Sequence, residues 1–283
     1  MTPDDGPPGR PTVEASAGPP RRSNPVVEEV RLFLTAVMFY TRIPCPRWVG
    51  YSEDQLNRST RHFPAMGWIV GAVLVAILAL AGLALPPILA VVLALAVGVL
   101  VTGAFHEDGF ADLCDGFGGG TSPERTLDIM KDSRVGAFAA IGLVLLFSLK
   151  IATLTVLVES GLVQAAAAIL FSQVLSRWCV VTIIFRDTYA RRDLTSKIKP
   201  IGRSLSGRGL VAATLWLVPF VGLAWWRPWW GLAVPIAWLV RLALAAWFRR
   251  RLGGYTGDCL GAAQQIIEQV VLLVLVGCSV QAV

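Results

Sequence analysis

Long apolar runs alternate with polar loops along most of this chain. From about residue 62 to the C-terminus, the runs approach the ~20 residues that a helix needs to cross a bilayer, and no separate soluble stretch interrupts them. This pattern predicts an all-α, polytopic integral membrane protein with about seven transmembrane helices. The predicted spans are approximately 62–84, 86–105, 134–158, 161–185, 209–226, 229–248 and 263–283.

The N-terminal region differs from the spans. Residues 1–29 hold seven of the 17 prolines beside Gly, Ser and charged residues, without a signal-peptide core. This composition predicts a disordered cytoplasmic tail, and residues 30–283 are predicted to form a single transmembrane catalytic domain. Residues 27–40 are amphipathic but too short to span, so we expect them to lie in the membrane interface or to re-enter the membrane.

Composition and charge agree with a membrane location. The chain is 55% hydrophobic and 16% charged, with a mean hydropathy of +0.63, whereas soluble domains carry about a quarter charged residues. If the predicted spans hold, 21 of the 25 lysines and arginines lie at one end of the bundle, and the positive-inside rule places that end in the cytoplasm. The net charge of +6 then needs no nucleic-acid partner.

Two minor features complete the composition. Lys150, Arg177 and Arg241 fall inside predicted spans and are isolated from other charges along the sequence. The five cysteines show neither pairing nor metal-ligand spacing, so no disulfide framework or zinc site is expected.

The densest cluster of potentially catalytic side chains is the motif His106–Gly116, directly after an apolar run. In a helix, Asp108, Asp112 and Asp115 would stand at i, i+4 and i+7, within a fan of roughly 60° on one face. Carboxylates so arranged favour a hard divalent cation, and Mg²⁺ is the natural occupant. Glu107 would point about 100° away and would need a bend to join them. The motif predicts metal-assisted transfer of a phosphate-bearing group at the membrane surface.

The rest of this first loop adds glycines and cations. Residues 116–123 are rich in glycine and are suited to approach phosphates or to close over a ligand. Lys131 and Arg134 are candidates to bind a diphosphate, and Asp132 is a candidate for a metal ligand or a proton relay. His106 is interpreted either as a proton shuttle or as an ordinary interfacial residue.

Two further polar loops fall on the same predicted side. The loop 186–208, which contains Arg191, is either a plain positive-inside loop or an arginine-rich wall for phosphates. The loop 249–262 sets four glycines around Tyr255 and Asp258, and such glycines let backbone N–H groups approach a ligand. Polar side chains continue from it into the last span, where they are costly unless they line a site; they are Gln264, Gln265 and Glu268.

In their order along the chain, these motifs resemble those of the cobalamin synthases, also called adenosylcobinamide-GDP ribazoletransferases. The segments that carry the resemblance are Phe39-Tyr40-Thr41-Arg42-Ile43-Pro44, Phe63-Pro64 with Gly67, His106–Gly116, Ile129–Gly136, Tyr189-Ala190-Arg191, Gly253–Asp258 and Gly261-Ala262. Each is weak alone, but the ordered set is specific and covers nearly everything after residue 30.

The resemblance implies a multi-pass enzyme of the bacterial inner (plasma) membrane, in late cobalamin biosynthesis, with its active site facing the cytoplasm. Such enzymes join adenosylcobinamide-GDP to α-ribazole or α-ribazole 5′-phosphate, release GMP and need Mg²⁺. The expected partners are these substrates and the lipid bilayer, with no nucleic acid. The oligomeric state is left open, a homo-oligomer included.

With this resemblance in view, each polar residue receives an expected role. The ligands of one or two Mg²⁺ ions bridging the diphosphate would be Asp108, Asp112 and Asp115. The cations facing the GMP leaving group would be Lys131 and Arg134. The base that deprotonates the acceptor hydroxyl is left open among Glu107, His106 and Asp132. The residues expected to bind the corrinoid or the nucleoside are Arg191, Tyr255 and Asp258.

Two rival functions share part of this pattern. A CDP-alcohol phosphatidyltransferase also cleaves a nucleotide diphosphate with spaced aspartates, but its motif couples Asp-Gly to an Ala-Arg pair, whereas here Ala111 is followed by Asp112. A cation-coupled transporter would place carboxylates near mid-membrane, whereas here they gather at one boundary. Release of GMP from the predicted substrate would separate the three.

Overall fold

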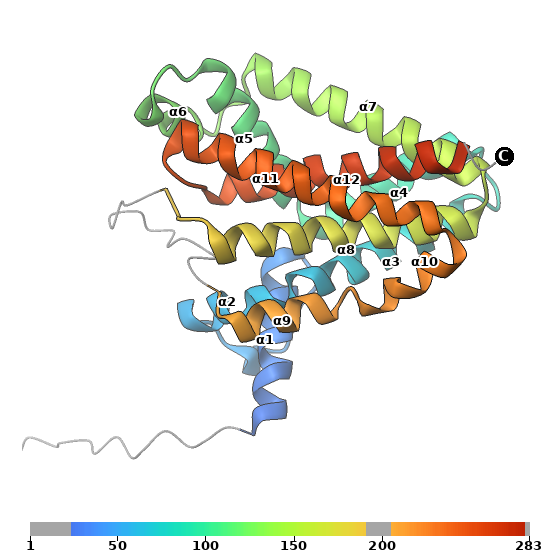
Figure 1. The fold of residues 1–283 in the computed structure, drawn as a ribbon, viewed down its shortest axis with the longest axis horizontal. Helices are drawn as coiled ribbons and strands as arrows, with labels where there is room; N and C mark the ends of the chain where they lie inside the picture. The colour runs from blue at the N-terminus through green and yellow to red at the C-terminus, as the bar shows by residue number, and fades with distance from the viewer. Residues whose placement is uncertain (1–23, 191–204, 281–283) are drawn as a thin grey trace, which may run out of the picture.

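The computed structural model describes residues 24–190 and 205–280, and these residues form a bundle of α-helices (Figure 1). The α-helices are α1 Pro25–Tyr40, α2 Glu53–Ser59, α3 Phe63–Ala81, α4 Pro87–Thr102, α5 Phe105–Gly119, α6 Pro123–Ile129, α7 Ala137–Glu159, α8 Leu162–Arg186, α9 Gly207–Leu215, α10 Leu223–Trp226, α11 Ala233–Leu252 and α12 Gly257–Val280. Short 3₁₀ turns are η1 Arg47–Val49, η2 Thr60–His62, η3 Val218–Gly222 and η4 Pro228–Leu232. The described residues contain no strand, which confirms the predicted all-α class.

Helix ends follow local sequence signals. Asn24 caps α1 by accepting a hydrogen bond from the Val26 amide (3.0 Å), and Pro25 occupies the first turn, where its missing N–H costs nothing. Ser122 caps α6 in the same way, accepting from the Arg125 amide at 3.2 Å. At the other end of a helix, Gly253 ends α11 in the left-handed conformation (φ 75°) that glycine adopts without strain.

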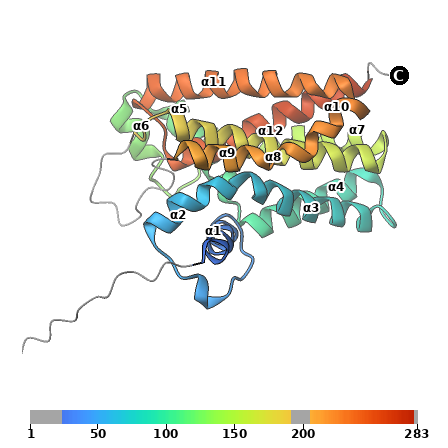
Figure 2. The same cartoon turned by 60° about the horizontal axis from the view of Figure 1, so that its bottom comes forward.

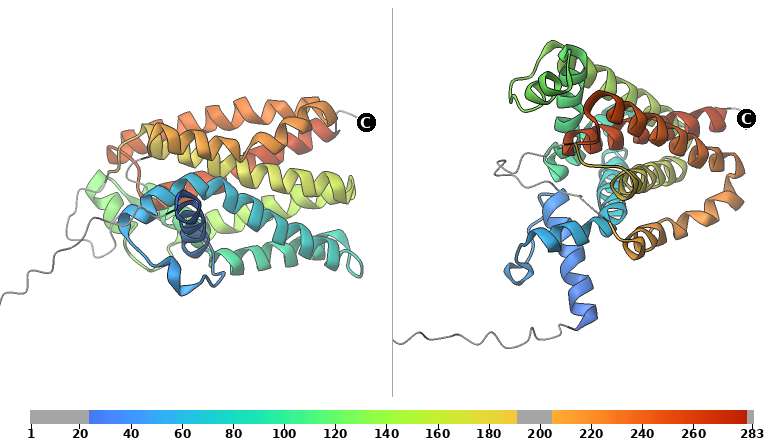
Figure 3. Two further views of the ribbon diagram at one scale, coloured as in Figure 1. Left: turned by 90° about the horizontal axis from the view of Figure 1, so that it is seen from below. Right: turned by 60° about the vertical axis from the view of Figure 1, so that its left-hand side comes forward.

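The two most deeply buried long helices, α8 and α12, form the centre of the bundle. Within their most apolar windows, 83% of α8 and 72% of α12 is buried, against 28% for α7. The helices α3, α7 and α11 pack against them, and α4 packs against α3 and α7 (Figures 2 and 3). The short helices α2 and α6 lie at one end of this bundle, and α10 lies at the other (Figure 1).

Five helical stretches are long and apolar enough to cross a membrane; they are 53–81, 137–159, 162–186, 228–252 and 257–279. A sixth candidate is the pair α4 and α5, which is bent by 90°. The predicted count of seven is therefore not confirmed in the described part of the chain. The predicted span 209–226 is interrupted, because Pro219 cannot donate its backbone N–H and the chain passes from α9 through η3 to α10.

The bend between α4 and α5 positions the acidic motif. Gly103 ends α4 in the left-handed region (φ 66°), and Ala104 follows with a φ of 59°, the only positive φ among described non-glycine residues. Ala104 starts α5 without a side-chain cap. The chain thus leaves the membrane-spanning direction before the acidic residues begin, and α5 packs against α12 and α7.

The amphipathic N-terminal segment is the helix α1, as predicted. It projects from the bundle across the direction of the long helices (Figures 1 and 3). Arg58 of α2 pairs with Glu28 of α1 at 2.8 Å, and Arg61 pairs with Glu29 at 2.9 Å, so the two helices are joined. Residues 1–23 of the predicted tail lie outside the described chain, and residues 25–29 form the start of α1.

Candidate active site

The acidic motif is helical, so its spacing has the predicted consequence. Asp108, Asp112 and Asp115 all lie on α5, with Asp108 exposed and the other two half-buried. Among the described residues, no group of three or more His, Cys, Asp or Glu side chains is arranged to hold a metal ion. The Mg²⁺ site predicted at Asp108, Asp112 and Asp115 stays a prediction.

Asp115 has a clear partner in the fold. Its carboxylate accepts hydrogen bonds from the backbone amides of Gly136 (2.6 Å) and Ala139 (2.9 Å). These amides belong to the start of α7, where the first N–H groups have no partner within the helix. Asp115 thus caps α7 from a neighbouring helix. Asp108 and Asp112 remain, at positions i and i+4. Proteins usually supply one or two carboxylates to a Mg²⁺ ion that is already bound to substrate phosphates, and two agrees with that number.

An open cleft with mixed charge lies between α5, α6 and the start of α7. It has a volume of about 570 Å³, and its charged lining residues are Asp115, Arg125, Asp128, Asp132 and Arg134. Asp128, placed outside the motif by sequence, therefore faces the same cleft as Asp115. Two arginines on an open cleft can hold phosphate oxygens.

Within this cleft, Asp132 and Arg134 bind each other. The Arg134 Nε donates to both carboxylate oxygens of Asp132 at 3.0 Å, and the Arg134 backbone amide donates to Oδ1 at 3.1 Å. These hydrogen bonds lower the pKa of Asp132 to about 2. Because a general base works best when its pKa is near the working pH, Asp132 is a poor candidate for the base.

The three polar loops meet at one end of the bundle. Arg251, at the end of α11, donates to the carbonyl oxygens of Phe117 (2.9 Å) and Gly120 (3.0 Å) at the end of α5. An isolated parallel β-bridge joins Tyr189, which follows α8, to Tyr255, which precedes α12. The convergence predicted from sequence is therefore present in the structure.

The predicted substrate-binding residues of the later loops differ in accessibility. Tyr255 is buried, with 1% of its surface exposed and its ring at 5.5 Å edge-on to that of Tyr189, and this burial raises its pKa. Asp258 is half-buried in the first turn of α12. Arg191 lies outside the described residues. Tyr255 is thus a buried, supporting residue of the loop in this structure.

The glycines of the third loop allow close packing between backbones. A Cβ at Gly254 would collide with the carbonyl oxygen of Thr188, and one at Gly261 would lie 3.2 Å from the carbonyl oxygen of His106. In the partner helix, a Cβ at Gly109 would lie 2.9 Å from the carbonyl oxygen of Asp258. Small residues of this kind let membrane helices approach closely. Gly261 and Gly109 therefore allow α12 to pack closely on α5, and Gly254 allows the third loop to approach the segment that follows α8.

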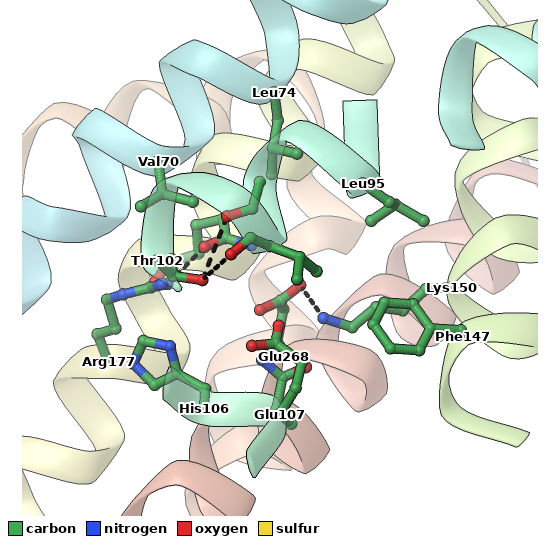
Figure 4. A pocket seen from close by; sticks show the side chains of 14 residues that line it. Val70, Leu74, Leu95, Thr102, His106, Glu107, Phe147, Lys150, Arg177 and Glu268 are labelled. Carbon is green, nitrogen blue, oxygen red and sulfur yellow. Dashed lines mark hydrogen bonds and ion pairs between the residues drawn. The ribbon is translucent and has the colours of Figure 1, made fainter. Parts of the chain in front are cut away.

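A second polar layer surrounds His106 and Glu107 of α5 and includes Lys150, Arg177 and Glu268 from other helices (Figure 4). Lys150 of α7 and Glu268 of α12 form an ion pair of 2.8 Å, with each side chain only 4% exposed. Glu268 also accepts from Gln264 at 2.6 Å, and Gln265 donates to Glu107 at 3.0 Å. This layer joins α5 to α7 and α12 at the depth of the membrane.

Two of the three charges that are isolated along the sequence inside the predicted spans have charged partners in the fold, and the third has polar and aromatic ones. Lys150 pairs with Glu268, and Arg241 pairs with Asp187 at 2.9 Å. Arg177 donates to the Gln173 carbonyl oxygen at 2.9 Å and lies over the ring of Phe63. The polar residues at 264, 265 and 268 were the available sequence signal, but Lys150 and Glu268 are 118 positions apart, so their pairing required the structure.

The chain has relatives along nearly its whole length. A sequence profile described as "Cobalamin-5-phosphate synthase" matches residues 32–276. A protein of Leptothrix cholodnii named adenosylcobinamide-GDP ribazoletransferase is 43% identical over 247 residues, covering 86% of this chain and 94% of that protein. Proteins of the same name from Shewanella frigidimarina and Ralstonia nicotianae are 42% identical over 262 and 250 residues, each alignment covering 88% of this chain and 95% of the relative. No solved structure matches this chain.

Proposed function

The chain belongs to the cobalamin-5-phosphate synthase family, and from this premise we propose that it is an adenosylcobinamide-GDP ribazoletransferase. It transfers the adenosylcobinamide-phosphate group of adenosylcobinamide-GDP onto α-ribazole or α-ribazole 5′-phosphate and releases GMP. The observation that carries this proposal is the family match over residues 32–276, which contains all three converging polar loops.

The reaction exchanges one bond to phosphorus for another. A ribose hydroxyl oxygen of the acceptor bonds to the phosphorus next to the cobinamide, the bond from that phosphorus to the bridging oxygen breaks, and GMP leaves with the electron pair. Because α-ribazole 5′-phosphate carries phosphate at its 5′ oxygen, we infer that the attacking hydroxyl is elsewhere on the ribose. The cations that would neutralise the leaving GMP are Lys131, which follows α6, and Arg125 and Arg134, which line the cleft.

We propose that Asp108 and Asp112 bind Mg²⁺ carried by the diphosphate. Both lie on α5 at i and i+4, and Asp108 is exposed, so this face of the helix is accessible to an incoming metal–diphosphate. When bound, the ion would offset charge on the phosphate oxygens. Asp115, on α5, would contribute to this site by holding the start of α7 in place rather than by acting as a third metal ligand.

We propose Glu107 as the base that takes the proton of the attacking hydroxyl. It adjoins Asp108, and its side chain is half-buried; its buried Oε2 has no hydrogen-bond partner within the described chain, while Oε1 accepts from Gln265. His106 is 2% exposed and stacks with Phe63, which leaves its ring less accessible. Asp132 is bound to Arg134 and has a pKa of about 2, so it is a poor proton acceptor at neutral pH.

A reconstituted assay tests the proposal. Purified protein in liposomes is given adenosylcobinamide-GDP, Mg²⁺ and either acceptor, and we expect GMP and a corrinoid product in equal amounts. Replacing Mg²⁺ by EDTA should abolish both. Turnover of a CDP-activated lipid without GMP release from either acceptor mixture would instead identify a CDP-alcohol phosphatidyltransferase, and no nucleotide release at all would overturn the enzymatic assignment.

A further inference from the structure

One face of α5 borders a small cavity whose walls combine polar and charged side chains with apolar ones (Figure 4). It has a volume of about 30 Å³, enough for one or two water molecules. The polar residues around it come from five helices, α4, α5, α7, α8 and α12; they are Thr102, His106, Glu107, Lys150, Gln173, Arg177, Gln265 and Glu268.

Four of these side chains keep a buried polar atom without a protein partner. The atoms are His106 Nε2, Glu107 Oε2, Arg177 Nε and Gln265 Oε1. His106, Arg177 and Gln265 are each only 2% exposed. Buried polar groups are almost always hydrogen-bonded, by protein or by ordered water, and all four of these residues line the same cavity. The cavity therefore requires an occupant.

The chemistry of the walls identifies the occupant as water. The unpartnered set includes an N–H donor on Arg177 and oxygen acceptors on Glu107 and Gln265, so the occupant must both accept and donate. The walls already balance two cations, Lys150 and Arg177, against two carboxylates, Glu107 and Glu268. A further cation or anion would leave an uncompensated charge at membrane depth, which is costly. Water meets both conditions.

The same layer holds Glu107 in one orientation. Gln265 donates to Glu107 Oε1 at 3.0 Å and also to Gln264 Oε1 at 2.9 Å, and Gln264 donates to Glu268 at 2.6 Å. Glu268 is in turn fixed by Lys150. Glu107 is therefore connected, through a continuous hydrogen-bonded chain on α12, to the ion pair that ties α12 to α7.

We propose that Gln265 is a positioning residue for Glu107, and that one or two internal waters complete the site by bridging Glu107, Gln265 and Arg177. This inference rests on the proposed role of Glu107 as the base. Gln265 does not touch substrate; it sets the direction of the Glu107 carboxylate, and a displacement of a reacting group by about 1 Å costs up to about a hundredfold in rate.

The variant Gln265→Met tests the positioning role. Met has a similar length and cannot donate to Glu107, so we expect kcat to fall about tenfold or more while KM stays within about twofold. Gln269→Met is the matched control: Gln269 lies one turn further along α12, is equally buried at 5% exposure, and does not line the cavity. It should keep kcat near the wild-type value.

The outcomes separate the two proposals. If wild-type protein releases no GMP, the proposed function fails. If wild-type protein is active and Gln265→Met matches Gln269→Met in kcat, positioning by Gln265 is wrong while the function stands. Equal losses of kcat and of thermal stability in both variants would also overturn it, because a purely structural role predicts that result.

The occupant is tested separately. A high-resolution structure of the wild-type protein in lipid should show density within hydrogen-bond distance of Glu107 Oε2 and Gln265 Oε1, and turnover should be the same in sodium, potassium and choline buffers. An empty cavity, or turnover that requires Na⁺ or K⁺, would contradict internal water as the occupant.

Discussion

Asp115 illustrates how one side chain of the acidic motif can serve the fold. Sequence spacing places it with Asp108 and Asp112 as a metal ligand, and the helix confirms that spacing. Its oxygens, however, accept from two amides at the start of α7. A sequence pattern predicts which face of a helix a carboxylate occupies. It does not predict which backbone groups from distant parts of the sequence lie next to that face.

Substituting the three aspartates should therefore give two different results. Asp108→Asn and Asp112→Asn are expected to lower GMP release by about a hundredfold, because each removes a ligand charge worth several kcal/mol, while leaving the thermal midpoint near that of the wild type. Asp115→Ala is expected to lower thermal stability as well, by the ~1–2 kcal/mol typical of a lost helix cap. Near-normal turnover in Asp108→Asn and Asp112→Asn would remove these residues from the site.

Asp132 supplies a prediction about pH. Its pKa in the folded protein is about 2, lowered mainly by hydrogen bonds from Arg134, against an ordinary value of 3.8. A carboxylate whose pKa is lowered by folding stabilises the folded protein when the pH is above the pKa of the unfolded state. That contribution is lost only as the pH falls through the pKa of the folded state. Between pH 5 and pH 9 the ion pair is therefore constant, and Asp132→Asn should leave the shape of the kcat/KM–pH profile unchanged. A limb of the profile that vanishes in this variant would restore Asp132 as the base.

At the scale of helices, the pair Lys150–Glu268 ties α7 to α12. Removing one partner leaves a buried charge alone, which typically costs about 3–5 kcal/mol, whereas replacing both partners can be nearly neutral. We expect Lys150→Met and Glu268→Gln each to reduce the thermal midpoint and the yield of folded protein in membranes. The double variant should recover both. A double variant as unstable as the two single variants combined would show that the two charges do not compensate each other.

The sequence predicted the elements whose signals are local. The apolar runs gave the positions of α3, α7, α8, α11 and α12, and the amphipathic pattern gave α1. The bend after α4 was missed, because Gly103 followed by Ala104 carries no strong breaker signal and the left-handed φ of Ala104 depends on its surroundings. The interrupted segment from α9 to α10 was also missed, although Pro219 and Gly222 were visible within the predicted span.

The candidate site divides in the same way. Convergence of the three loops was predictable, because the charge bias placed them on one side, and contacts such as that of Arg251 with Gly120 agree. The inner polar layer was only half visible. Gln264, Gln265 and Glu268 were noticed as polar residues within a span, but their partners Glu107 and Lys150 lie more than 100 positions away, and pairing over such separations is set by packing.

At the scale of the whole molecule, the three loops lie at one end of the bundle and α10 lies at the other. This arrangement predicts which segments face each side of the membrane. In a background without the five cysteines, Ser122→Cys should react with a membrane-impermeant maleimide only from the cytoplasmic side. Ser160→Cys, at the opposite end of α7, should react only from the outside. Both serines are exposed. Labelling of the two positions from the same side would contradict the arrangement of the spans and the cytoplasmic location of the site.

The 90° bend after α4 also fixes the depth at which this protein works. With 16 residues, α4 rises only about 24 Å, less than the ~30 Å of hydrocarbon in a typical bilayer. A bilayer of that thickness would place the start of the acidic helix below the level of the lipid headgroups unless the bilayer thinned to match α4. We therefore expect the thickness of the bilayer to affect the activity of the enzyme. We expect lipids with shorter acyl chains to bring the cytoplasmic surface nearer to Asp108, so that a water-soluble nucleotide substrate reaches it with less disturbance of the membrane.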